Sequence, residues 1–152
     1  MMDKIAVFLA QYLIILSVLI VPYLWVRRER HDLIRIAIST LVAYAAVEML
    51  KTLAAAPRPF VAESFTPLIN MSAAEFYGSF PSGHVTFLAA LGTAVLFTEK
   101  VPGLIMLVIA GLVGWGRVLV GVHYPVDVLG GFLIGIITAG LFKIIHDRFP
   151  VW

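Results

Sequence analysis

Five long apolar stretches constrain most strongly what this chain can fold into. They cover approximately residues 5–26, 33–53, 83–98, 103–122 and 126–145. Most approach the roughly 20 residues that a helix needs to cross the hydrocarbon core of a bilayer. Hydrophobic residues make up 61% of the 152 residues and charged residues 13%, whereas soluble domains have about 45–50% and about 25%. We therefore predict a single all-α domain, 1–152, folded as a polytopic helical membrane bundle of about five transmembrane helices.

The segments between these stretches differ in length and composition. Residues 27–32 and 98–103 form short charged turns, whereas residues 54–81 form the only long connection. It contains the structure-breaking residues Pro57, Pro59, Pro67, Gly78 and Pro81, and the aromatic residues Phe60, Phe65, Phe76, Tyr77 and Phe80. We expect a long loop between the second and third helices, lying at the membrane interface.

The distribution of positive charges predicts the orientation in the membrane. An alternating path of five spans puts most of the basic residues on one side, namely Arg27, Arg28, Arg30, Arg35, Lys100, Lys143 and Arg148. By the positive-inside rule this side is cytoplasmic, with the N-terminus outside and the long loop extracytoplasmic. Lys4, Lys51, Arg58 and Arg117 fall on the other side. We expect a cell (inner) membrane protein whose first apolar stretch is a span rather than a cleavable signal peptide.

Composition also excludes several classes of function. The sequence has no cysteine, so disulfides and thiolate metal sites are excluded. The net charge of +2 is scattered in short clusters, and no basic stripe indicates a nucleic-acid partner.

Three polar blocks, residues 51–59, 81–84 and 117–127, fall at the predicted extracytoplasmic ends of the spans. They carry Lys51, Arg58, His84, Arg117, His123 and Asp127. Because the alternating path brings these ends to one membrane surface, we expect the six side chains to converge. Charged groups near a membrane span are costly and are usually functional.

This set of residues suits a phosphoryl group. Lys51, Arg58 and Arg117 supply cationic donors for several anionic oxygens. Ser82 and Gly83 stand at a predicted helix start, where free N–H groups and the helix dipole favour an anion. A histidine can attack phosphorus or protonate a leaving oxygen, and a carboxylate can fix its tautomer.

The residues alone leave other interpretations open. Lys51 and Arg58 could be interfacial snorkelling residues, and His84 could cap or pack a helix. His123 and Asp127, four residues apart with Pro125 at a possible helix start between them, could form a structural pair or part of a metal site. No third metal ligand with suitable spacing is evident.

The three blocks together resemble the type 2 phosphatidic acid phosphatase superfamily. Its signature is K-x6-R-P, then P-S-G-H, then S-R-x5-H-x3-D, and the chain carries it over about residues 33–145. The resemblance implies a phosphatase independent of metal and cofactor, with His123 as nucleophile, Asp127 as its partner and His84 as general acid. It also implies a phosphate site formed by Lys51, Arg58, Ser82, Gly83 and Arg117.

Two features depart from the family pattern. Gly116 stands where the family usually has serine, so we expect one hydroxyl contact to be missing or replaced by backbone. Membrane members often have six spans, and this chain offers five. We expect the missing helix to be N-terminal to the catalytic core, where its loss could alter how lipid enters.

The resemblance leads to a hypothesis about the substrate. We expect a lipid phosphate or diphosphate at the outer leaflet, with undecaprenyl diphosphate first and phosphatidylglycerophosphate, phosphatidic acid and lipid A phosphate as alternatives. A phosphotransferase with the same site is a rival, since phosphohistidine can pass its phosphate to acceptors other than water. A non-catalytic transporter or structural protein would leave the converging cations and histidines unexplained.

Other residues carry weaker expectations. Glu48 should pair with Lys51 one helical turn away. The small-residue pair Gly131 and Gly135 should allow close helix packing within the bundle, with dimerisation as the alternative. The residues expected to lie at the interface or in packing are Trp115, Tyr124 and Trp152. The loop carboxylates Glu63 and Glu75 could meet a headgroup, but solvation is the default.

Overall fold

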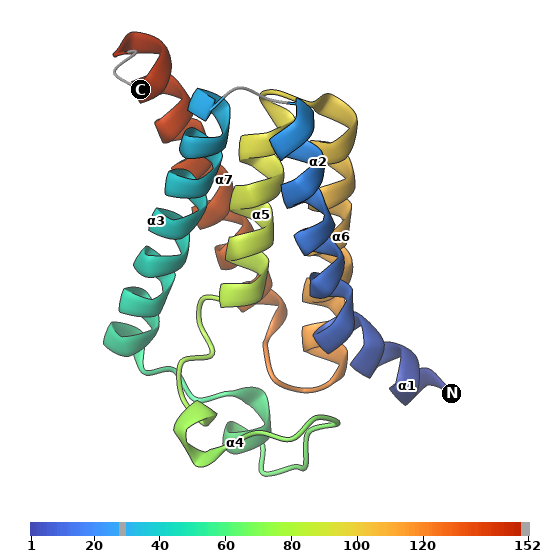
Figure 1. The fold of residues 1–152 in the computed structure, drawn as a ribbon. Coiled ribbons are helices and arrows are strands. Elements are labelled where there is room, and N and C mark those ends of the chain that lie inside the picture. The colour runs from blue at the N-terminus through green and yellow to red at the C-terminus, as the bar shows by residue number, and fades with distance from the viewer. Residues whose placement is uncertain (28–29, 150–152) are drawn as a thin grey trace.

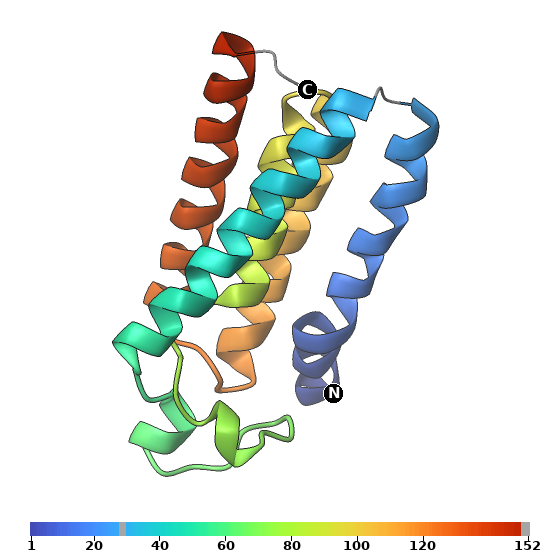
Figure 2. The ribbon, with the colours of Figure 1, turned by 60° about the vertical axis from the view of Figure 1, so that its left-hand side comes forward.

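The N-terminal part of the chain forms one continuous helical segment with changing helical geometry. The computed structural model describes residues 1–27 and 30–149. The N-terminal segment runs through α1 (Met2–Val7), a π-helical turn η1 (Phe8–Tyr12), a 3₁₀ stretch η2 (Leu13–Leu19) and α2 (Ile20–Arg27) (Figures 1 and 2). Arg28 and Trp152 lie outside the described residues.

The rest of the described chain is also helical. It contains α3 (Arg30–Ala54), α4 (Pro59–Ala62), η3 (Ala73–Glu75), α5 (Gly83–Leu96), α6 (Lys100–Leu119) and α7 (Pro125–Arg148). Within the described residues, 1–27 and 30–149, the only β-type pairing is an isolated bridge between Pro57 and Tyr77. The prediction of an all-α fold is confirmed for this part of the chain.

Within the described residues, four helical stretches are long and apolar enough to cross a membrane. They are Met2–Arg27, Arg30–Ala54, Lys100–Leu119 and Pro125–Arg148. The fifth apolar helix, α5, has only 14 residues, so it is about 21 Å long at 1.5 Å per residue. That is shorter than a hydrocarbon core of about 30 Å. The sequence placed the end of this stretch near Thr98, whereas the helix ends at Leu96.

Helix α5 occupies the centre of the bundle and packs against α3, α6 and α7. Most of its residues are buried. Gly131 and Gly135 of α7 make the approach to α5 possible, because a Cβ at Gly131 would lie 2.7 Å from Ser82 O and one at Gly135 would lie 2.7 Å from Ala90 N. These glycines therefore serve close packing within the bundle, as the sequence predicted.

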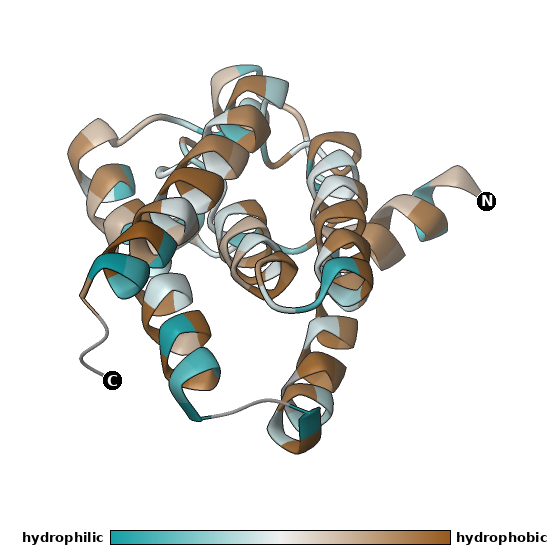
Figure 3. Cartoon of the chain, turned by 90° about the horizontal axis from the view of Figure 1, so that it is seen from above, coloured by the Kyte–Doolittle hydropathy of each residue, from teal (hydrophilic) through white to brown (hydrophobic). Residues whose placement is uncertain are grey.

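The outward faces of the helices are apolar, as a bilayer requires. Viewed along the bundle, hydrophobic residues cover the outer sides of the long helices (Figure 3). The large exposed side chains include Leu41 on α3, Ile105 and Trp115 on α6, and Leu133 and Ile144 on α7. Because contiguous apolar surface of this extent is rare on soluble proteins, these faces fit contact with lipid.

One end of the bundle, here called the loop end, is covered by residues 55–82 (Figure 1). The connection between α6 and α7 and the N-terminus lie at the same end, whereas the turn between α5 and α6 and the end of α7 lie at the opposite end. Backbone hydrogen bonds join the two ends of this covering segment, from Arg58 N to Phe76 O (3.0 Å) and from Ser79 N to Ala56 O (3.0 Å). The three polar blocks therefore meet at one end of the bundle.

Candidate active site

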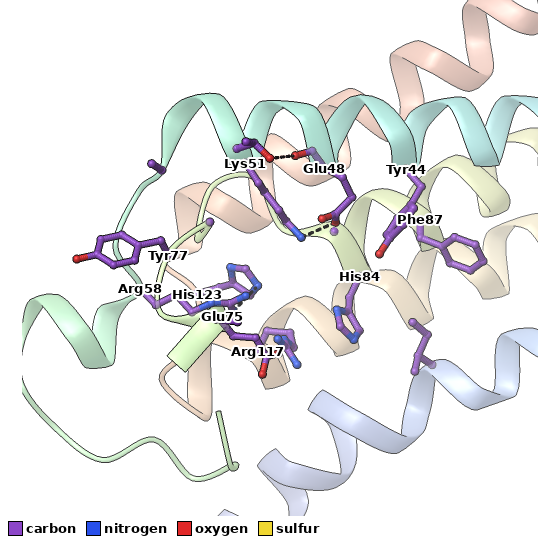
Figure 4. Close-up of a pocket in the computed structure, with 16 residues that line it drawn as sticks. Tyr44, Glu48, Lys51, Arg58, Glu75, Tyr77, His84, Phe87, Arg117 and His123 are labelled. Carbon is purple, nitrogen blue, oxygen red and sulfur yellow. Dashed lines mark hydrogen bonds and ion pairs between the residues drawn. The ribbon is translucent and has the colours of Figure 1, made fainter. Parts of the chain in front are cut away.

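A cavity of about 740 Å³ opens at the loop end. It is lined by six of the predicted site residues, from three helices and two loops: Lys51, Arg58, Gly83, His84, Arg117 and His123. Figure 4 shows both histidines and the two arginines around the same hollow, with Lys51 above them. The convergence expected from the topology is therefore present.

His123 lies at the base of this cavity with Asp127 behind it. Its Nδ1 is 3.4 Å from Asp127 Oδ2, and both side chains are nearly fully buried. The same oxygen accepts hydrogen bonds from Ser79 Oγ (2.6 Å) and from the backbone N–H of Tyr124 (2.8 Å). Since a carboxylate can only accept, Asp127 favours the tautomer with the proton on Nδ1 and leaves a lone pair on Nε2.

Helix α7 positions this pair. It begins with Pro125 at its first position, and Asp127 reaches back to cap the helix at Tyr124 N. Proline at the first position is already set for the helix and lacks an N–H that would be unpaired there. The predicted helix start at Pro125 is confirmed, and the short helical offset from His123 to Asp127 follows from it.

Arg58 lies directly against the free nitrogen of His123. Its Nη1 is 3.4 Å from His123 Nε2 and donates to Val122 O at 3.2 Å. A guanidinium has no acceptor, so this contact agrees with a lone pair on Nε2. The Arg58 Nε is buried and has no hydrogen-bond partner. The Arg58 guanidinium also lines the cavity, so it can donate to an anion bound there.

Arg117 reaches the same hollow from the end of α6. Its side chain is 6% exposed, and its Nε is also buried without a partner. Two buried arginines with unpaired donors beside one histidine favour an oxyanion such as phosphate, because a guanidinium can engage two oxygens at once.

Lys51 approaches the start of α5. Its Nζ donates to Glu48 Oε1 at 2.7 Å, which confirms the predicted pair. A Cβ at Gly83 would lie only 2.7 Å from that Nζ, so any larger residue would displace the lysine. The missing side chain at Gly83 lets the ammonium group and the N-terminus of α5 face the same space.

Ser82 is the N-cap residue of α5, at the helix start predicted for it. It is fully buried, its Oγ has no partner, and it does not line the cavity. Its backbone N–H donates to Asp127 O at 3.0 Å. Ser82 therefore joins the start of α5 to the start of α7, and a direct role in holding phosphate stays a prediction.

The surroundings of His123 keep its ring neutral. Burial lowers the pKa of His123 to about 4, and the nearby Arg117 and Arg58 act in the same direction, although the hydrogen bond to Asp127 opposes the shift. Burial also lowers the pKa of Arg58, from an ordinary value so high that the guanidinium stays charged near neutral pH. At pH 7 the site therefore combines a neutral imidazole with cationic donors.

Several residues of the site were not predicted from the sequence. Ser79 holds Asp127, and the cavity wall includes Ile14, Tyr44 and Phe87. Ser79 lies two residues before the second block, where no pattern marks it, and Ile14 comes from the far N-terminal segment. The positions of Phe87, one helical turn after His84, and of Tyr44, two turns before Lys51, could have indicated shared helix faces.

The two loop carboxylates have different surroundings. Glu75 lines the cavity, and hydrogen bonds from the backbone and hydroxyl of Ser72 hold the pKa of its carboxyl below the ordinary value. Glu63 instead accepts a hydrogen bond from Tyr124 OH at 3.0 Å. Glu75 is therefore the loop carboxylate within reach of a headgroup.

Gly116 faces the N-terminal segment. A Cβ there would lie 2.7 Å from Ala10 N and 2.7 Å from Leu9 Cβ. A serine at this position would collide with the backbone of η1. The departure from the family serine thus coincides with close packing of the N-terminal segment on α6.

The donor set around the cavity is a poor match for a metal ion. Three cationic side chains surround the two histidines, and they would repel a divalent cation. Within residues 1–27 and 30–149 no group of three His, Asp or Glu side chains is placed to hold a metal. Independence from metal stays a prediction for experiment.

Comparison with known proteins identifies the class. Residues 32–150 match the family described as the PAP2 superfamily. The match covers most of the chain, so the chain belongs to this superfamily. It is an integral membrane lipid phosphatase, in keeping with its relatives and its membrane-spanning helices.

Particular relatives cover most of the chain. The undecaprenyl-diphosphatase BcrC of Bacillus subtilis (strain 168) is 33% identical over 144 residues, which are 93% of this chain and 73% of that protein. The crystal structure of Aquifex aeolicus LpxE superposes with a TM-score of 0.73 at 28% identity, covering 93% of this chain and 82% of that one. The crystal structure of a PAP2-type phosphatidylglycerolphosphate phosphatase from Bacillus subtilis gives a TM-score of 0.71 at 30% identity, covering 97% and 75%.

Proposed function

We propose that the chain hydrolyses a lipid diphosphate or phosphate through a phosphohistidine on His123, with undecaprenyl diphosphate as the preferred substrate. The observation that carries the mechanism is the arrangement around one imidazole. Asp127 holds Nδ1, and Arg58 Nη1 lies 3.4 Å from Nε2 at the cavity floor. The nucleophile and the phosphate-binding cations thereby share one space.

In the first step His123 Nε2 attacks phosphorus. A P–N bond forms, the bond from phosphorus to the leaving oxygen breaks, and His84 gives its proton to that oxygen. Arg58, Arg117 and Lys51 neutralise the charge that builds on the equatorial oxygens. For a lipid diphosphate the leaving group is the lipid monophosphate.

In the second step water replaces the lipid. Water attacks phosphorus, the P–N bond breaks, and a proton from the water returns to His84. Inorganic phosphate leaves, and His123 is again neutral with a free Nε2. Asp127 stabilises the positively charged imidazole ring of the intermediate without taking its proton.

Similarity to relatives supports the preferred substrate. A relative that covers 93% of this chain carries the name undecaprenyl-diphosphatase. Other relatives named phosphatidylglycerophosphatase and lipid A 1-phosphatase cover 55% and 58% of the chain. Phosphatidylglycerophosphate, phosphatidic acid and lipid A phosphate are the alternative substrates.

The orientation that fits this function has the loop end outside the cytoplasm. Basic residues gather towards the other end of the bundle, where Arg27, Arg30, Lys100, Lys143 and Arg148 lie, and positive residues favour the cytoplasmic side. With α5 counted as a fifth, shorter span, the N-terminus is outside and the C-terminus is in the cytoplasm. The substrate is then taken from the outer leaflet of the cell membrane.

A phosphotransferase would use the same first step and pass the phosphate to another lipid or sugar. Release of inorganic phosphate in the absence of any acceptor distinguishes hydrolysis from transfer. Transfer of label to an added acceptor, with no free phosphate, would favour the rival.

The test is a phosphate-release panel on the purified protein in detergent, with a chelator present. It compares undecaprenyl diphosphate, phosphatidylglycerophosphate, phosphatidic acid and a lipid A phosphate. We expect the highest kcat/KM for undecaprenyl diphosphate and no loss on chelation. Trapping and mass analysis of phosphate on His123 tests the intermediate, and activity that vanishes with chelator would contradict the mechanism.

A further inference from the structure

A second hollow lies beside the catalytic cavity and has the opposite chemical character. It is a groove of about 410 Å³ between the N-terminal segment and α3, with α5 as its floor. Its walls include Leu24 and Trp25 on α2, Ile36, Ala37, Thr40 and Leu41 on α3, and Phe87 and Leu91 on α5. The N-terminal segment and α3 lie on either side of α5 (Figure 1).

The groove is apolar along its whole length. The two hydroxyls in its wall are satisfied within their own helices, since Ser17 Oγ donates to Ile14 O at 2.6 Å and Thr40 Oγ1 donates to Ile36 O at 2.8 Å. They therefore present no free donor to a polar guest. A hydrocarbon chain fits this surface, whereas a charged or hydrated group would lose its hydration without compensation.

The groove and the catalytic cavity meet at Phe87. This side chain lines both hollows and follows His84 by one turn of α5 (Figure 4). On the opposite wall, Ile14 lines the catalytic cavity and Ser17, one turn later, lines the groove. A molecule with a phosphate at His123 could therefore continue into the groove without a break.

The groove is also open towards the bilayer. Its rim residues Val18, Trp25 and Leu41 are largely exposed. The N-terminal segment packs mainly on α6, and its contacts with α3 are few. A chain already in the membrane could enter sideways between them.

The geometry points to this groove as the seat of the substrate's hydrocarbon chain, which leads directly from the phosphate bound at His123. The assignment rests on the proposed function. Because lipid tails are as apolar as the groove, the groove adds little net affinity over the bilayer. Its effect is to orient the lipid, so that phosphorus meets Nε2 in line.

The first test fills the groove. Ala37 is exposed on α3 and lines only the groove, while Ala45 is exposed on the same helix and lines neither hollow. We expect Ala37→Trp to lower kcat/KM about tenfold for a long-chain lipid phosphate, as lost positioning does, and Ala45→Trp to leave it unchanged. A short-chain soluble phosphate ester that ends before the groove should be cleaved equally by both variants.

Equal kcat/KM for Ala37→Trp and Ala45→Trp at every chain length would overturn the assignment while leaving the proposed function standing. A wild-type protein that cleaves no lipid phosphate would instead refute the proposed function. The two failures are therefore distinguishable.

The second test does not depend on a variant. Non-hydrolysable lipid phosphonates with a photoreactive group early in the chain are cross-linked to the wild-type protein, one with a polyprenyl chain and one with acyl chains. We expect label on residues 17–25 and 33–41, displaced by unlabelled phosphonate, and the more effective probe identifies the chain type. Label spread over the lipid-facing sides of α6 and α7, without displacement, would mean that only bulk lipid contacts the protein and would overturn the assignment.

Discussion

Both ends of the bundle bury arginine side chains, but the two environments differ. Towards the end opposite the loop end, Arg35 is 1% exposed, and its Nη2 donates to Ala94 O at 3.3 Å and to Asp32 Oδ1 at 3.5 Å. Its guanidinium lies 6.0 Å from the ring centroid of Phe97. Arg35 lines neither the catalytic cavity nor the apolar groove.

The difference between Arg35 and the two arginines of the loop end shows which feature distinguishes a catalytic site from a structural contact. Ala94 is in the last turn of α5, where carbonyls have no partner within the helix, so Arg35 satisfies one of them and ties α3 to the end of this short helix. At the loop end, Arg58 and Arg117 face a cavity that also holds His123. Arg35 also has unpaired nitrogens, so burial and unpaired donors alone do not distinguish a structural arginine from one at the candidate active site. The cavity shared with a neighbouring histidine makes that distinction.

The largest expected difference between the two ends is the effect on kcat of replacing a histidine. We expect His123→Ala to lower kcat by at least about 10³-fold, because the nucleophile is removed. His146, on α7 near the opposite end, has a buried Nδ1 without a partner. His146→Ala should leave kcat within about twofold, since no step of the mechanism uses it. Phosphate release measured on both purified variants decides the comparison.

The second largest difference is expected in the effect on kcat/KM of replacing an arginine by lysine. We expect Arg117→Lys to lower kcat/KM about 100-fold, because lysine cannot reproduce the two-oxygen contact of a guanidinium. Arg35→Lys should leave kcat/KM within about threefold but lower the thermal unfolding midpoint, because a contact between α3 and α5 is weakened. If Arg35→Lys costs the folded enzyme as much activity as Arg117→Lys, the distinction between the two ends is wrong.

Substitution of Ser79 tests whether its hydrogen bond to Asp127 helps to orient His123. We expect Ser79→Ala to lower kcat/KM about tenfold, because Asp127 loses a charge-assisted hydrogen bond and His123 is less firmly oriented. KM should change less than kcat, since Ser79 lies behind the pair rather than in the cavity. Thr93→Val removes a buried hydroxyl without a partner from the other half of α5 and serves as the matched control, with no change in kcat expected.

The smallest effect is on the pH profile. Nucleophilic attack needs neutral His123, so the acid limb of kcat/KM should fall as the pH drops towards the lowered pKa of about 4. Arg58 helps to lower this pKa, so Arg58→Gln should move the acid limb to higher pH. Arg35→Gln should not move it. The profiles of the wild type and both variants are measured on one substrate from about pH 3.5 to about pH 7. Because the substrate's own ionisation is then the same for all three proteins, any difference between the profiles comes from the protein.

Much of the fold and of the candidate site could be predicted from local sequence patterns. Apolar runs indicate helices because the bilayer requires every backbone group to be paired within the segment. Pro125 predicted the start of α7, and the spacing of Glu48 and Lys51 predicted their ion pair, because both depend on one turn of helix. The shared end of His84 and His123 followed from alternating spans.

Other features depend on contacts between segments distant in the chain. Ser79 meets Asp127 only because residues 55–82 fold back over the loop end. Arg35 looked like a member of the basic turn near residue 30, yet it lies inside α3 and is buried against α5. Gly116 looked like a lost phosphate contact, and its neighbour proved to be the backbone of η1.

The amino-acid order by itself determined the membrane class, the helical elements and the candidate phosphate-binding and catalytic residues, because these follow from hydrophobic length, helix periodicity and functional groups. Tertiary structure alone decided which nitrogen of His123 is free, that Ser82 is buried and does not line the cavity, and that an apolar groove continues from Phe87. Each of these depends on distances of a few ångströms between helices. Such distances are set by how side chains pack, which no local pattern encodes.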